Sequence, residues 1–213
     1  MPSLKPLYLF VLKLSVVYGL FLIPWPGVMT AYRAAFCAGG NTFFRTLGGS
    51  GRVYFGPREE PITAGKDVIA RLENVGNRAA GVMEMNSRLI GYLPTGFAIS
   101  LIVATPVPWK RRAVAVLWGS AAASVFVGVT VWLRLVNAFS DSNPLTVFAF
   151  GPFWKGTVVV LLKVLAMSPV TAYIAPVVIW ALVCLRREDL VRIATHVRGG
   201  GDGDPSGECM AES

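Results

Sequence analysis

Cys37 is the side chain best suited to covalent chemistry. It lies in the segment AFCAGGN with Arg33 four residues before it, and a nearby cation favours the nucleophilic thiolate form. The chain's one histidine, His196, is far along the sequence, so no general base accompanies the thiol. Cys37 is therefore either a nucleophile activated by arginine alone or a small apolar residue at an interface. Because Cys184 and Cys209 are too scattered to complete a zinc site, we expect no metal and no cofactor.

The segment MNSRLIGYLP contains three candidates for contact with a partner or substrate: Asn86, Arg88 and Tyr92. In one interpretation Asn86 or Ser87 caps the helix that follows. In the other, the strand before the segment pairs with an extended peptide and Arg88 binds a carboxylate. The residues alone leave both interpretations open.

Arg134 lies inside the apolar segment VTVWLRLVNAF and is the fourth contact candidate. Ionisable residues within apolar runs are functional candidates by default. A long arginine side chain can also reach a polar surface from such a position, which would make Arg134 an anchor only. Both roles are kept as predictions.

The elements that position these side chains follow from an apolar composition. The chain of 213 residues is 54% hydrophobic and 15% charged, with a mean hydropathy of +0.57. Soluble domains carry about 25% charged residues. Because the apolar residues form long runs, the composition predicts an integral membrane protein and argues against a soluble enzyme.

We predict an all-α membrane protein, a bundle of about four transmembrane helices with a small extracytoplasmic β-containing insertion between helices 1 and 2. Trp25 would anchor the first helix at an interface, and small residues such as Gly119 and Ala123 favour close packing of the third. The predicted spans are residues 7–28 within an N-terminal segment 1–28, residues 90–109, the third helix after a basic turn within 110–139, and residues 165–185.

The connecting segments have their own predicted roles. Residues 29–89 form the extracytoplasmic segment, an interfacial helix followed by short antiparallel strands at RVYF, DVIARLE and AAGVMEM, with a turn at residues 74–78. Residues 140–164 form an outer loop and an interfacial amphipathic segment, although a re-entrant hairpin over 154–185 is the alternative. A cytoplasmic helical extension over 186–198 and a disordered tail over 199–213 complete the chain.

The net charge of +8 is concentrated beside apolar runs, which favours anionic lipid headgroups over nucleic acid as partners. The positive-inside rule places these basic turns in the cytoplasm. With an even number of spans, both termini are then cytoplasmic in a multi-pass protein of the inner membrane. The predicted headgroup contacts are Lys110, Arg111, Arg112, Arg186 and Arg187.

The stretch NSRLIGYLPTGFAISLIVATPVPWKRRAVAVLWG, residues 86–119, resembles the small integral membrane proteins associated with exosortase H. The resemblance implies a non-enzymatic accessory protein that assists protein sorting or envelope assembly at the outer face of the membrane. The implied partners are a membrane-embedded sorting protease and its exported substrates. Cys37, Arg88 and Arg134 echo the order of catalytic residues in exosortases, so a thiol transpeptidase or protease is one alternative function. A small transporter or channel subunit is another.

Overall fold

The computed structural model describes residues 5–58, 65–140 and 145–184. It is mostly helical with one small sheet, as predicted for the fold and its β-containing insertion. The predictions for residues 186–198 and 199–213, together with those for Arg186 and Arg187, lie outside the described residues.

The described chain contains six α-helices, two π-helical turns and four strands. The helices are α1 (Lys5–Leu22), α2 (Pro26–Phe43), α3 (Leu93–Ala104), α4 (Trp109–Ser140), α5 (Pro152–Leu161) and α6 (Pro169–Cys184), and the π-helical turns are η2 (Arg88–Tyr92) and η3 (Leu162–Met167). The strands are β1 (Thr46–Leu47), β2 (Gly51–Pro57), β3 (Val68–Asn74) and β4 (Ala79–Met85).

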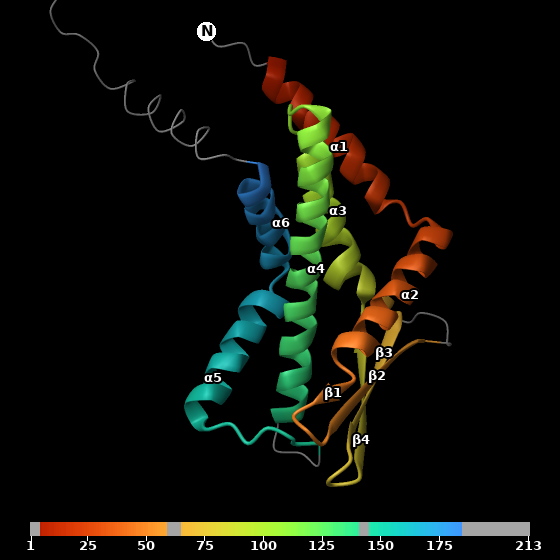
Figure 1. Cartoon of the computed structure of the whole chain (residues 1–213), viewed down its shortest axis with the longest axis vertical. Helices are drawn as coiled ribbons and strands as arrows, with labels where there is room; N and C mark the ends of the chain where they lie inside the picture. Colours follow the sequence, from red (N-terminus) through yellow and green to blue (C-terminus); the bar gives the residue numbers. More distant parts are fainter. Residues whose placement is uncertain (1–4, 59–64, 141–144, 185–213) are drawn as a thin grey trace, which may run out of the picture.

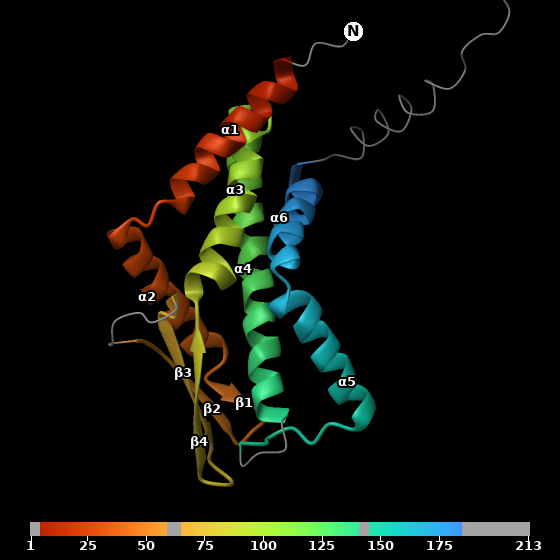
Figure 2. The same ribbon diagram turned by 180° about the vertical axis from the view of Figure 1, so that it is seen from behind.

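Helix α4 runs along the length of the molecule, and different elements pack beside its first and second parts (Figure 1). Helices α1, α3 and α6 lie beside its first part, and we call these elements with residues 109–126 the helical half. Helix α2 and the sheet lie beside its second part, and we call these elements with residues 127–140 the sheet half. The view from behind shows the same division, with α5 on the opposite side of α4 from the sheet (Figure 2).

A single row of buried residues, each four positions after the last, joins the two halves along α4. Consecutive members of this row touch, and because four residues turn an α-helix by about 400°, the row winds around α4 from the side of α3 to the side of the sheet. The residues in the row are small beside α3 and larger beside the sheet. They are Ala115, Gly119, Ala123, Val127, Val131, Leu135 and Phe139.

The sheet is antiparallel with strand order β1-β2-β3-β4. Its inward face, which includes Val53, Ala70 and Leu72, packs on the second part of α4 to form one apolar core. Its other face is polar, with Arg52 paired across the strands with Glu73. This alternation is typical of a sheet with one face in water. The three predicted strand segments correspond to β2, β3 and β4.

The turn between β3 and β4 falls where the sequence predicts it. The Asn74 side chain accepts hydrogen bonds from the backbone N–H groups of Gly76 (3.0 Å) and Asn77 (3.3 Å). Asn74 also donates to the carbonyl of Thr146 at 2.8 Å, which fastens the hairpin to the segment after α4. An asparagine side chain that bonds to the backbone just after it is a common turn device.

Two of the predicted spans are interrupted by breaks between helices. Helix α1 ends at Leu22 and α2 begins at Pro26, at an angle of 79° between them, so residues 7–28 are not one helix. Proline has no N–H to donate and suits the first position of a helix, which explains why a new helix starts there. The last helix likewise begins at Pro169 and not at Leu165, with a second bend of 79° between η3 and α6.

By length and composition, α4 is the one helix of the described residues that could cross a membrane unaided. The two bent pairs would raise the number of candidate spans to three if each acts as one span. The apolar helix over 88–104, which corresponds to the predicted second span, is shorter. A bundle of four spans therefore goes beyond what these helices establish.

Candidate functional site

The η2 turn, which joins the end of β4 to α3, is the place where several predicted site residues meet. The Asn86 side-chain oxygen accepts a hydrogen bond from the Leu89 N–H at 2.9 Å and so caps the new helix. Ser87 has a different role, because both its N–H (2.7 Å) and its hydroxyl (2.5 Å) donate to the Asp67 carboxylate. The predicted N-cap is thus Asn86, and Ser87 ties the end of β4 to the start of β3.

Arg88 connects this turn to the first helix. Its Nη2 donates to the backbone carbonyl of Leu22 at 2.6 Å, at the point where α1 ends. The last carbonyls of a helix lack partners within the helix and carry partial negative charge, so a cation there is stabilising. Part of the Arg88 guanidinium is therefore used to hold the break between α1 and α2.

A cavity of about 560 Å³ lies between this break and the end of the sheet, and we call it the Arg88 cavity. Asn86 and Arg88 line it together with Arg33 and Asp67, which come from α2 and from the start of β3. Two arginines face one carboxylate that is already bound to Ser87. The cavity therefore favours a negatively charged group. Sequence reasoning missed Asp67, because only the fold brings it next to Ser87.

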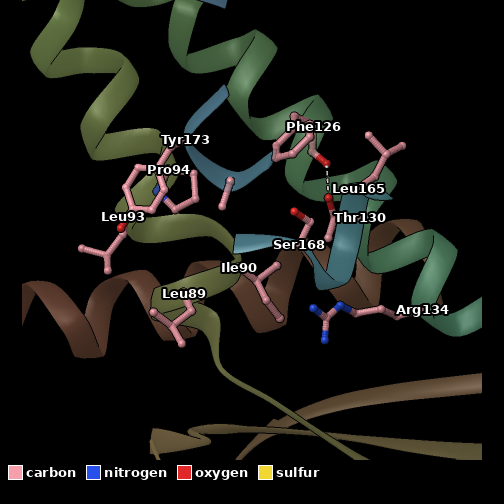
Figure 3. A pocket seen from close by; sticks show the side chains of 11 residues that line it. Leu89, Ile90, Leu93, Pro94, Phe126, Thr130, Arg134, Leu165, Ser168 and Tyr173 are labelled. Atoms are coloured by element: carbon pink, nitrogen blue, oxygen red, sulfur yellow. Dashed lines mark hydrogen bonds between the residues drawn. The ribbon is translucent and has the colours of Figure 1, made fainter. Parts of the chain in front are cut away.

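A second cavity, of about 270 Å³, lies on the other side of the η2 turn and shares Leu89 and Leu93 with the first. We call it the Arg134 cavity. Figure 3 shows the Arg134 side chain extending from α4 toward Ile90, with Ser168 on an adjacent segment of the same chain. The predicted contact residues Arg88 and Arg134 thus line different cavities.

The side chains of Tyr92 and Cys37 are both buried among apolar neighbours. Tyr92 is 7% exposed, and its ring packs between those of Phe21 and Tyr32, with centroid distances of 5.7 and 5.4 Å. Cys37 is 8% exposed and belongs to the apolar core that includes Phe55. Helix α2, which carries Cys37, packs on β2 of the sheet.

Burial raises the pKa of the Cys37 thiol, and the nearby Arg33 offsets only part of this rise. The arginine activation that the sequence suggested is therefore outweighed by desolvation, and the thiol form is favoured at neutral pH. This environment fits the alternative prediction, a small apolar side chain in an interface.

The two edges of the sheet differ in what covers them. On the β2 side, Asn41 of α2 acts like a short strand: its Nδ2 donates to the Phe55 carbonyl at 2.9 Å, and the Phe55 N–H donates to its Oδ1 at 2.8 Å. Gly40 permits this approach, because a Cβ there would lie 2.7 Å from the Phe55 ring. No strand in the described part of the chain pairs with the other edge, β4. The Asn41 contact joins residues 14 apart, so no local sequence pattern predicts it.

The basic residues in the first turn of α4, predicted as a cytoplasmic turn, are mainly bonded within the protein. Arg111 Nη2 donates to the Cys184 carbonyl at 2.8 Å, at the end of α6, and Arg112 donates to the Thr105 carbonyl at 3.3 Å. Lys110 is exposed. Of these three predicted headgroup contacts, Lys110 is the one whose side chain is most open to a lipid surface.

No group of three or more His, Cys, Asp or Glu side chains within residues 5–58, 65–140 and 145–184 is arranged to hold a metal ion. Comparison with protein-family models, with curated proteins and with solved structures gave no significant match.

Proposed function

We propose that the chain is a multi-pass membrane protein whose helical half lies in the bilayer and whose sheet half lies at the outer surface. The exposed apolar side chains of the helical half support this placement, since a soluble monomer rarely exposes so continuous an apolar surface. On α4 such side chains follow one face, continue a short way into the sheet half and end near residue 132. They are Val114, Leu117, Trp118, Val125, Val129 and Trp132.

The length of α4 supports the same placement. Its 32 residues correspond to about 48 Å, whereas the hydrocarbon core is about 30 Å thick. The surplus of about 18 Å allows α4 to cross the hydrocarbon core and to continue beyond it beside the sheet. The polar face of the sheet, with Arg52, Arg71 and Glu73 in water, favours this half outside the hydrocarbon.

Within this arrangement, we propose that the protein is a non-enzymatic accessory factor that docks an extended segment of an exported polypeptide on β4. The observation that carries the proposal is the contrast between the two long strands at the sides of the sheet: the outer side of β2 is covered by the two-residue strand β1 and by Asn41, whereas no strand of the described residues pairs with the outer side of β4. An open edge provides backbone groups for an added strand. The Arg88 cavity lies at the end of β4 and offers positive charge to a carboxylate of the same segment.

The proposed biological context is sorting of the exosortase type or assembly of the envelope, following the resemblance over residues 86–119. The partners would be a membrane-embedded sorting protease and its tail-bearing substrates. The burial of Cys37 argues for this accessory role over the thiol transpeptidase alternative.

Processing of an exported reporter with a C-terminal sorting tail tests the accessory role. In cells that lack this protein, the wild type and Cys37→Ala should restore processing equally. Loss of processing with Cys37→Ala, at normal protein level, would favour the enzyme instead.

A photoreactive residue at Val82, which is 66% exposed on β4, tests the docking edge. It should crosslink to the same reporter, whereas the probe at Arg52 on β2 should not. Equal crosslinking from both positions would rule out docking on β4.

A reporter domain inserted after Asn77 in the exposed hairpin turn tests the proposed membrane placement. It should report that the sheet half lies on the outer side.

A further inference from the structure

The Arg134 cavity combines one cation with an otherwise apolar or hydroxyl-bearing lining. Phe126 and Leu165 are on its apolar side, and Thr130, Ser168 and Tyr173 supply hydroxyl groups. No acidic residue is among the described residues that line it. Figure 3 shows the guanidinium directed into the space between α4 and the η2 turn. This is the composition expected of a site for a molecule with an anionic head and an apolar body.

The position of Arg134 along α4 selects a lipid as this molecule. Arg134 follows Arg112 by 22 residues, which corresponds to about 33 Å along the helix. The hydrocarbon core has a thickness of about 30 Å. If the basic turn at Lys110–Arg112 lies at one headgroup layer, Arg134 lies at the other, where the phosphates of the outer leaflet are.

The amino end of α6 adds to the attraction for an anion. Ser168 directly precedes α6, and Ala172 in its first turn also lines the cavity. The first N–H groups of a helix lack acceptors within the helix and attract negative charge. Arg134 and this helix end therefore act on the same space.

We propose that the Arg134 cavity binds an anionic phospholipid of the outer leaflet, with the phosphate at Arg134 and Ser168 and the upper acyl chain against Phe126 and Leu165. This site rests on the proposed membrane placement but is separate from docking on β4. The bound lipid fastens the bend between η3 and α6 to α4, because the cavity is lined from both.

Binding of phosphatidylglycerol to the purified full chain in detergent, measured by native mass spectrometry, tests the proposal. Arg134→Gln should weaken binding about tenfold, the effect of losing one charge-assisted hydrogen bond. Ala172→Phe should weaken it similarly by filling the cavity with the charge intact. Arg71→Gln, which removes an exposed arginine from the polar face of the sheet, is the matched control and should bind like the wild type.

Three outcomes would overturn the proposal. Arg134→Gln and Ala172→Phe could bind phosphatidylglycerol like the wild type, which would make Arg134 only a surface anchor. Phosphatidylcholine could bind as tightly as phosphatidylglycerol, which would remove the anionic selectivity. Inorganic phosphate could compete fully at millimolar concentration, which would assign the site to a free anion. If Arg134→Gln does not fold, Ala172→Phe decides, and crosslinking at Val82 is scored independently.

Discussion

The buried row along α4 is built from different residues in the two halves of the molecule. Beside α3 the buried row consists of Ala115, Gly119 and Ala123, whereas beside the sheet it ends in Leu135 and Phe139. In lipid, apolar surface gains little by burial, so helices associate through close backbone approach at small residues. In water, burial of large apolar side chains is the main stabilising term. Under the proposed placement, the change of residue size along the row corresponds to the passage of α4 from lipid to water.

The largest test of this contrast is Phe139→Ala. Phe139 is fully buried between α4 and the sheet, and removal of such a ring costs about 3–5 kcal/mol. Hydrogen exchange should show loss of protection in β2 and β3 with α3 unaffected. Phe153→Ala, at a residue that is 77% exposed, is the control and should leave both halves unchanged. Equal loss of protection in α3 would mean that the halves unfold together.

The complementary test in the helical half is Gly119→Val. A Cβ at Gly119 would lie 2.3 Å from Cδ1 of Ile102, which is itself fully buried. Overpacking of this kind costs about 1–3 kcal/mol. The midpoint of thermal unfolding in detergent should fall while the sheet amides stay protected. Gly128→Val meets no atom within 4 Å of its Cβ and should be tolerated, so an equal fall there would contradict the close-packing role.

A smaller effect is expected for Asn41→Ala at the closed edge. The variant leaves the N–H and carbonyl of Phe55 without their side-chain partner, at a cost of about 1–2 kcal/mol. Hydrogen exchange of the Phe55 amide should become faster. Thr42→Ala, whose hydroxyl donates to the Ala38 carbonyl of its own helix, is the control and should leave that exchange unchanged.

The smallest expected effect concerns Glu84 and pH. Hydrogen bonding with Lys66 holds the pKa of the Glu84 carboxyl below its usual value, and the charge of Arg58 acts in the same direction. The ion pairs of Glu84 thus contribute fully to stability above the usual glutamate pKa of about 4.3. Their contribution is lost as pH falls through the lowered pKa of Glu84. Exchange protection of β4 should decrease slightly over that acidic range. Glu84→Gln should abolish this dependence, and an unchanged profile would exclude the ion pairs as its cause.

Short-range sequence patterns were sufficient to predict most of the sheet half. Alternation in Val68–Asn74 and the turn residues around Asn74 predicted the hairpin, and the polar residue Asn86 predicted a cap. These features depend on residues a few positions apart, which is the range over which sequence patterns carry information.

The features that the sequence missed depend on contacts over longer distances or on competing signals. The segment IPWPG is apolar enough to continue a span, but the proline at position 26 starts a new helix instead. Asn41 and Asp67 are ordinary surface residues by type, and only the fold places them at the edge and at Ser87. One interpretation of the sequence has Arg88 bind a carboxylate, and only the fold shows that Arg88 also donates to the carbonyl of Leu22, 66 residues away.

Asn41 also limits how copies of this chain can assemble. A sheet with two usable edges can add copies without end, as fibres do. Here the strand at one edge, β1, is two residues long, and Asn41 occupies the next backbone groups of β2, so little backbone is left there for an added strand. Strand pairing between copies through β4 would therefore stop at a symmetric pair.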